Sequence, residues 1–370
     1  HKYAASVTAP TCTAKGYTTY TCSICDDSYV ADKVAATGHN YSDGTCTGCG
    51  AADPDAVVDP GLTLNYPTLS FEDEILVNLY YTVSDMTNVV EQGMLVFYNV
   101  GEYTIENADD IYIGSTYDPV KNRYMSTTDG IAAKEMGDTR YYVAYVKLTD
   151  GSYVYTEAKA YSPKQYAMNM LNKSTTSDTQ KALCVAMLNY GAAAQVYFNH
   201  NVDNLMNSEL TAEQKALNIG YDKSLFTGAV AADSNKIGSF VRSSTGYSKR
   251  TATVSFEGAF VINYYFIPDR AVNGDVTFYY WTPEAYANAD VLAAGNASGT
   301  CAMVENDGVY FAQVTGIAAK ALSEAVYVAA VYTNGGTTWT SGVLGYSIGA
   351  YCASQSNGTG TMAELAKATA

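Results

Sequence analysis

Two pairs of cysteines near the start of the chain have the spacing of metal ligands. Cys22 and Cys25 form one Cys-x-x-Cys pair, and Cys46 and Cys49 form another after an interval of 20 residues. Two thiolates on one tight turn can bind the same ion, and a second such turn completes the tetrahedral coordination that Zn²⁺ prefers. The spacing therefore predicts a structural zinc site of the zinc-ribbon type.

Other combinations of ligands compete for this ion. Cys12, Cys22, Cys25 and His39 are equally a Cys₃His set, and His1 is a further nitrogen ligand. In an oxidising compartment an even subset of these cysteines could instead form disulfides. The predicted zinc ligands are Cys12, Cys22, Cys25, His39, Cys46 and Cys49, with disulfides as the alternative.

The three remaining cysteines are weaker candidates for a functional role. Cys184 lies on the apolar face of a predicted helix, where an inert buried thiol is expected. Cys301 and Cys352 both lie in the last third of the chain and could form a disulfide bridge there.

Residues suited to catalysis are sparse. Ser347 stands in a Gly-x-Ser-x-Gly pattern, but no histidine follows it to act as base. Glu72 and Glu257 recur at equivalent positions, although each half of the chain offers only one such acid and glycoside hydrolysis needs a pair. We therefore expect a protein that is not an enzyme.

A covalent cross-link is a further alternative. In Gram-positive surface domains a buried lysine can condense with an asparagine beside an acid. Here Lys134 with Asn78, or Lys320 with Asn263, would be the partners. Each such isopeptide bond would lower the mass of the intact protein by one ammonia, which mass spectrometry would detect.

The only two tryptophans, Trp281 and Trp339, are the residues best suited to bind a ligand. Exposed aromatic rings on a β-sandwich can stack on the C–H faces of sugars, so a glycan platform would include both, with Tyr279 and Tyr280 as weaker candidates. Tryptophan also often fills the core of a sandwich, and strand alternation sends one of the two tyrosines inward. Their exposure therefore distinguishes a glycan-binding surface from a core.

The chain contains an internal repeat of about 185 residues, and both tryptophans lie in its second copy. Ser70 and Phe71 recur as Ser255 and Phe256, and Gly-Ile-Ala-Ala-Lys occurs at both 130–134 and 316–320. Within each copy, short runs of β-branched and aromatic residues alternate with turn signals, which is typical of a sandwich of two antiparallel sheets.

Between the copies the apolar period changes to that of a helix. Ser177 and Asp178 are the N-cap candidates of a long helix, and Thr211-Ala-Glu-Gln214 has a capping-box pattern that begins a shorter one. The predicted fold is therefore mainly β, with two tandem antiparallel, Ig-like β-sandwich domains related by internal duplication, intervening helices and an N-terminal zinc-ribbon-like module. The predicted divisions are a Cys/His module at 1–52, a linker at 53–62, sandwiches at 63–167 and 226–352, a helical segment at 168–225 and a truncated helix at 353–370.

Composition excludes some partners. The 37 acidic and 21 basic residues give a net charge of −16, which repels nucleic acid. No apolar run approaches the length of a membrane span, so membrane insertion is not expected. The last predicted helix stops before any C-cap signal, and we expect further domains of the same polypeptide.

Two segments resemble a known class of protein. Gly38-His39-Asn40-Tyr41 and the cysteine pairs are similar to short Cys/His repeats of large modular extracellular proteins from Gram-positive gut anaerobes. Residues 186–198 resemble a helix that follows β-rich modules in such proteins. The resemblance implies an extracellular, cell-surface or secreted location and no established activity. We expect a noncatalytic module that binds a polysaccharide or a host or plant glycan, or alternatively a structural spacer or adhesin stalk.

Overall fold

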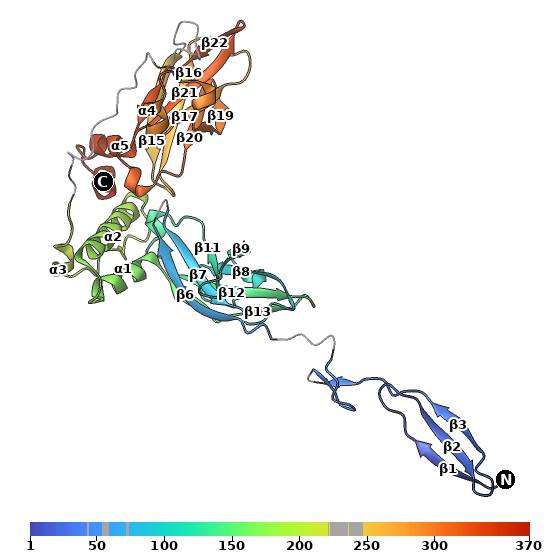
Figure 1. The fold of residues 1–370 in the computed structure, drawn as a ribbon. Helices are drawn as coiled ribbons and strands as arrows, with labels where there is room; N and C mark the ends of the chain where they lie inside the picture. Colours follow the sequence, from blue (N-terminus) through green and yellow to red (C-terminus); the bar gives the residue numbers. More distant parts are fainter. Residues whose placement is uncertain (43, 54–58, 72–73, 221, 223–235, 237–246) are drawn as a thin grey trace. The chain divides into compact units, whose positions relative to one another are not determined.

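The structure is a computed structural model that describes residues 1–42, 44–53, 59–71, 74–220, 222, 236 and 247–370 (Figure 1). Two compact units are present, one of residues 1–63, 82–92 and 145–155, the other of residues 64–81, 93–144 and 156–370. The described chain is mainly β and its sheets are antiparallel, as predicted. No helix among these residues is both long enough and apolar enough to cross a membrane.

The N-terminal module, residues 1–53, consists of short strands with almost no core. Three strands form a meander and two form a small hairpin: β1 (Tyr3–Thr8), β2 (Gly16–Cys22), β3 (Ser28–Val34), β4 (Tyr41–Ser42) and β5 (Thr45–Cys46). Every residue of β1 is exposed. The buried residues among those described in this module are Gly16, Thr18, Cys22 and Cys46. Because so little apolar surface is buried, something other than a hydrophobic core must hold the module together.

The first sandwich has a four-stranded and a five-stranded sheet. The four-stranded sheet has the order β10-β11-β7-β6, and the other has the order β13-β12-β8-β9 with β14 paired to β12. Along β7, Val77, Leu79 and Tyr81 alternate into the core. The strands are β6 (Thr63–Ser70), β7 (Leu76–Thr82), β8 (Val89–Phe97), β9 (Asp110–Ile113), β10 (Thr116–Asp118), β11 (Arg123–Thr127), β12 (Arg140–Leu148), β13 (Tyr153–Tyr155) and β14 (Lys159–Tyr161), with short 3₁₀ turns η1 (Ile105–Asn107) and η2 (Ala133–Glu135).

The second sandwich repeats this strand order. Its sheets run β15-β16-β20-β19 and β18-β17-β21-β22, with β23 paired to β21 (Figure 1). An internal duplication predicts this correspondence. The elements are β15 (Tyr247–Ser255), β16 (Val261–Pro268), β17 (Thr277–Trp281), α4 (Pro283–Asn288), η5 (Ala294–Asn296), β18 (Gly299–Cys301), β19 (Met303–Asn306), β20 (Val309–Val314), η6 (Ala319–Ala321), β21 (Val326–Asn334), β22 (Thr337–Thr340) and β23 (Leu344–Tyr346).

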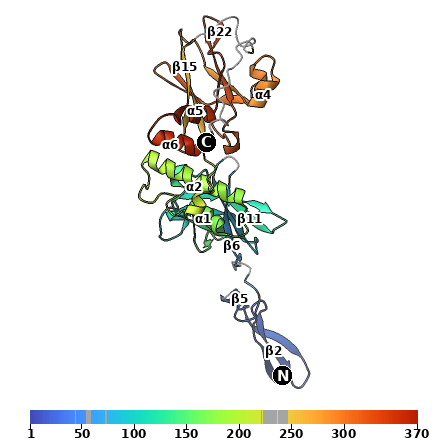
Figure 2. The ribbon, with the colours of Figure 1, turned by 90° about the vertical axis from the view of Figure 1, so that its left-hand side faces the viewer.

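A pair of helices follows each sandwich. Helix α1 (Pro163–Asn172) packs against α2 (Asp178–Phe198), and α5 (Ile348–Gln355) packs against α6 (Thr361–Thr369) (Figure 2). The repeated Ser162 and Ser347 are the N-caps of α1 and α5, because their hydroxyls accept the backbone N–H groups of Gln165 and Ala350. The predicted capping residue Ser177 begins α2, and Thr211 begins α3 (Ala212–Lys215).

Repeated polar residues join neighbouring strands in both sandwiches. The Asn78 side chain donates to the Ser70 hydroxyl at 2.8 Å and accepts from Thr127 at 2.7 Å. In the second sandwich Asn263 donates to Ser255 at 2.9 Å and accepts from Gln313 at 2.9 Å. Both asparagines are buried. The repeat of Ser and Asn in the sequence is thus explained by a three-strand hydrogen-bond ladder.

Some predicted divisions fall partly outside the described residues. The structure does not describe residues 54–58 of the predicted linker or residues 226–235 and 237–246 of the predicted second sandwich. Glu72 also lies outside the described residues. The strands of the second sandwich begin at Tyr247.

Candidate metal centre

Four side chains of the N-terminal module converge on one point. The ligand atoms of Cys12, His39, Cys46 and Cys49 all lie within 4.8 Å of one another. Cys12 Sγ is 3.7 Å from Cys46 Sγ, and His39 Nδ1 is 3.4 Å from Cys49 Sγ. In a tetrahedron with Zn–S bonds of about 2.3 Å, neighbouring sulfurs are about 3.8 Å apart. This Cys₃His cluster could therefore hold a metal ion.

The β4–β5 hairpin and the turn after it position two of these thiols. The Cys46 N–H donates to Ala51 O at 2.7 Å and the Gly50 N–H donates to Cys46 O at 2.8 Å, which closes the Cys-x-x-Cys turn. Gly50 has φ +72°, a left-handed conformation that glycine adopts without strain. A Cβ at Gly48 would lie 3.1 Å from Cys12 Sγ, so the turn approaches Cys12 closely.

Backbone hydrogen bonds bring the other two ligands to this turn. The Gly38 N–H donates to Cys12 O at 3.1 Å, which ties the segment before His39 to Cys12, and the Thr47 N–H donates to Asn40 O at 2.9 Å, which ties the same segment to the Cys46–Cys49 turn. The His39 ring stacks on Tyr41 with centroids 5.4 Å apart, which orients the imidazole.

The electrostatics of the cluster favour a thiolate. Hydrogen bonds from the Gly48 backbone and from His39 lower the pKa of the Cys46 thiol to about 5. The pKa of the Cys12 thiol is raised, because it hydrogen-bonds toward the sulfurs of Cys49 and Cys46. One thiolate surrounded by further sulfur and nitrogen ligands is the donor set that attracts a borderline-soft cation.

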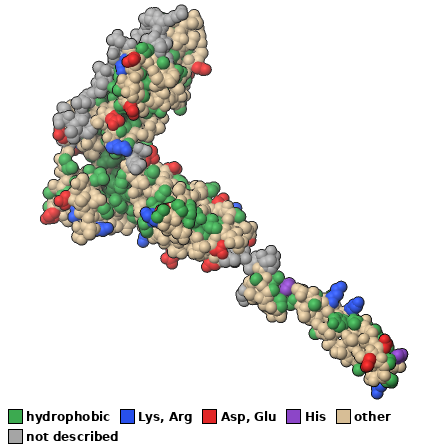
Figure 3. Space-filling view, viewed as in Figure 1, with side chains coloured by type: hydrophobic (Ala, Val, Ile, Leu, Met, Phe, Trp, Pro, Cys, Tyr) green, Lys and Arg blue, Asp and Glu red, His purple; other side chains and the backbone are tan. Residues whose placement is uncertain are grey.

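A second group contains the other Cys-x-x-Cys pair. The ligand atoms of His1, Cys22 and Cys25 lie within 4.8 Å of one another, and His1 Nδ1 is 3.2 Å from Cys25 Sγ. A hydrogen bond from the Ile24 backbone lowers the pKa of the Cys22 thiol. In Figure 3 histidine side chains lie at two separate places on the N-terminal module.

The grouping of ligands differs from both sets that spacing suggested. The two Cys-x-x-Cys turns do not share one site, and Cys12 lies with Cys46 rather than with Cys22. A signal for the observed grouping was present, since a His-x-Tyr sequence, His1-Lys2-Tyr3 or His39-Asn40-Tyr41, precedes each pair. All eight cysteines lie in the described part of the chain and are free thiols.

The predicted bridge between Cys301 and Cys352 is therefore absent. Burial raises the pKa of the Cys301 thiol to about 11 and that of the Cys352 thiol to about 12. Cys184 is buried, as expected, and burial raises its pKa as well. Desolvation keeps all three thiols protonated and unreactive at neutral pH.

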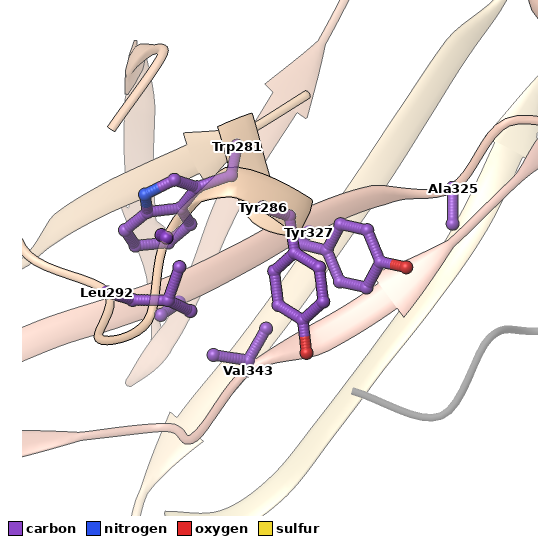
Figure 4. Packing of buried hydrophobic residues seen from close by; sticks show 8 residues of the cluster. Trp281, Tyr286, Leu292, Ala325, Tyr327 and Val343 are labelled. Carbon is purple, nitrogen blue, oxygen red and sulfur yellow. The ribbon is translucent and has the colours of Figure 1, made fainter. Parts of the chain in front are cut away.

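The proposed aromatic platform is not exposed as a whole. Trp281 is fully buried in a cluster with Tyr286, Leu292 and Val343 (Figure 4), and its indole N–H donates to Asn296. Because none of the Trp281 side chain is exposed, its ring is not available to stack on a sugar in this structure. The Tyr279 ring packs on the same cluster.

The other two platform residues are half-buried. The Tyr280 ring lies over Gly299, where a Cβ would come within 2.9 Å of it. Trp339 has the Arg270 guanidinium over its ring, with the carbon 3.5 Å from the centroid. Trp339 thus retains partial access but has one face covered.

Residues considered for covalent chemistry have structural roles. The buried Ser347 caps α5 and is not presented on a nucleophile turn. Asn78 and Asn263 bond to hydroxyl and amide side chains of neighbouring strands.

No protein-family model matches the chain, and no curated protein matches it. The function must therefore be inferred from the residues themselves.

Proposed function

We propose that the chain is a noncatalytic spacer of a cell-surface or secreted protein, with an N-terminal module stabilised by zinc. The observation that supports the spacer role is the burial of Trp281, since the predicted glycan platform included both tryptophans and a spacer has no reason to expose them. The two sandwiches have the same strand order, as expected of repeated units in a spacer.

Zinc is the cofactor that best suits Cys12, His39, Cys46 and Cys49. Three sulfurs and one imidazole nitrogen are a common structural zinc set, whereas Mg²⁺ and Ca²⁺ prefer oxygen. The module buries almost no apolar residue, so the free energy of metal binding would supply much of its folding free energy.

Glycan binding is the second candidate, and one observation favours it. Trp339 Nε1 and Arg270 Nη1 are both buried and have no acceptor among the described residues. Both atoms are covered in this conformation, so a small movement of the Arg270 side chain off the indole ring would be needed before they could donate to a sugar hydroxyl. The ligand would be a polysaccharide or a host or plant glycan.

Tryptophan fluorescence distinguishes the two roles. In a Trp281→Phe protein, Trp339 is the only reporter, and titration with soluble glucans and mucin glycans should leave its emission unchanged if the chain is a spacer. A saturable shift that disappears in an Arg270→Gln variant would overturn the spacer role and establish glycan binding. Metal analysis of the protein purified under reducing conditions tests the zinc site. If Cys49→Ser leaves the zinc content unchanged, the assignment of this site is wrong.

A further inference from the structure

The group His1, Cys22 and Cys25 has the same local architecture as the four-ligand cluster. In both, the N–H of the first cysteine donates to the carbonyl five residues later, at 2.7 Å from Cys22 to Asp27 O and from Cys46 to Ala51 O. In both, the N–H of the residue after the second cysteine donates back to the first, at 3.0 Å from Asp26 and 2.8 Å from Gly50. The two hairpins therefore present their sulfurs in the same way.

The backbone at Asp26 supports this equivalence. Asp26 has φ +56°, the left-handed conformation that Gly50 adopts at the matching position. Such a φ is uncommon for a residue with a side chain, although aspartate tolerates it better than most. The turn at Cys22 thus keeps the shape of a metal-binding turn even where the sequence lacks the glycine.

The histidine of each group is also placed alike. The His1 ring stacks on Tyr3 with centroids 5.7 Å apart, as the His39 ring stacks on Tyr41. His1 and Cys25 are exposed while Cys22 is buried. A cation bound here would have two sulfurs and one nitrogen as ligands and one side facing outward.

We propose that His1, Cys22 and Cys25 form a second metal site, separate from the four-ligand cluster, for a divalent cation of the zinc type. The two clusters differ in one respect: the first has Cys12 as a fourth ligand, and no fourth His, Cys, Asp or Glu joins the second among the described residues. A tetrahedral cation bound by three ligands keeps one position for an exchangeable ligand. The second site therefore binds metal more weakly and accepts a small external donor such as water, an imidazole or a thiol.

Cobalt substitution tests this proposal in the full chain. Metal is removed with a chelator under reducing conditions, and Co²⁺ is added while the visible d–d bands and the near-ultraviolet thiolate charge-transfer bands are recorded. Two cobalt ions per chain are expected, bound in two steps. A titration that ends at one ion per chain in the unaltered protein would overturn the proposal, whatever the variants do.

Paired double variants assign the two steps. Cys22→Ser/Cys25→Ser should remove the weaker step and leave a spectrum that added imidazole does not change. Cys46→Ser/Cys49→Ser should remove the tighter step and leave a spectrum that imidazole does shift. If Cys22→Ser/Cys25→Ser still binds two ions, the second ion lies elsewhere and the assignment is wrong.

Thiol counting separates a metal site from a disulfide. In the unaltered protein, a thiol reagent should modify Cys22 and Cys25 rapidly without zinc and slowly with it, as read by peptide mass spectrometry. A mass two hydrogens lower in the peptide that contains both cysteines, under the same reducing conditions, would instead show a redox disulfide and contradict the metal site. Lys2→Ala, next to the ligand His1, is the control and should change neither result.

Discussion

Cys12 Sγ lies 3.7 Å from Cys46 Sγ, so residues from opposite ends of the N-terminal module meet at one point. Chelation of zinc should therefore unfold residues 1–53 and leave the sandwiches folded, since these have cores of their own. Limited proteolysis with and without chelator would show cleavage between residues 1 and 53 alone. A Cys12→Ser/Cys22→Ser variant, which lacks a ligand of each group, should reproduce this pattern in the presence of zinc, and Thr13→Ala, at an exposed position, should not.

The left-handed backbone conformation of Gly50, the residue after the second cysteine, should contribute to zinc affinity. Gly50→Ala forces a Cβ into a conformation that costs about 1 kcal/mol, which would weaken zinc binding about fivefold because folding and binding are coupled. Competition with a chromophoric chelator measures the change. Gly50→Asn should lose less zinc affinity than Gly50→Ala, because asparagine tolerates this conformation. Equal losses of affinity in both variants would exclude backbone strain as the cause.

The hydrogen-bond ladder should contribute to sandwich stability. Asn78→Ala removes two side-chain hydrogen bonds and leaves Ser70 and Thr127 without their partner, at an expected cost of about 1–3 kcal/mol in the free energy of unfolding. Urea denaturation measures this cost. Asn65→Ala, at an exposed position of β6, should stay within about 0.5 kcal/mol of the parent.

Burial of Trp281 predicts both a stability and a spectroscopic result. Trp281→Ala should cost about 3–5 kcal/mol, because a large side chain is removed from a packed cluster. In a Trp339→Phe protein the remaining Trp281 emission should be blue and insensitive to iodide. Red, readily quenched emission would show that the indole is accessible to solvent.

The Tyr98 hydroxyl donates to Asp110 at 2.6 Å, and this raises the pKa of Tyr98 to about 12. Since the fold favours the neutral phenol, the resulting stability is present below pH 10 and is lost as the pH rises from 10 toward 12. A ¹³C NMR titration of the tyrosine ring carbons would follow Tyr98 directly. Asp110→Asn should lower its pKa toward the ordinary value, and an unchanged pKa would assign the shift to burial instead.

The strands and the caps of α2 and α3 were predictable because they depend on local patterns. Alternating apolar residues and side chains such as Ser177 act within a few residues of their own position. The helix predicted at 353–370 corresponds to α6 and the end of α5, but the start of α5 at Ile348 was missed, since Ile348–Gln355 is rich in Gly, Ala and Ser and carries no clear apolar period. The start of α1 at Pro163 likewise fell inside the predicted first sandwich.

The partners of each cysteine could not be predicted from spacing. A Cys-x-x-Cys sequence determines that two thiols share a turn, but not which distant residue reaches that turn. Cys12 joins Cys46 because backbone bonds tie residues 37 and 38 to residues 11 and 12, and the Thr47 N–H donates to Asn40 O. The orientation of Trp281 was equally undetermined, because alternation assigns neighbours to opposite faces without saying which face is the core.

The scarcity of buried residues in the module has a mechanical consequence. An unfolded stretch of 53 residues can extend to about 180 Å, far beyond the span of folded strands six or seven residues long. In the spacer proposed above, withdrawal of zinc would therefore lengthen and soften this segment without breaking the chain, whereas oxidation of Cys12 and Cys46 to a disulfide would keep it short.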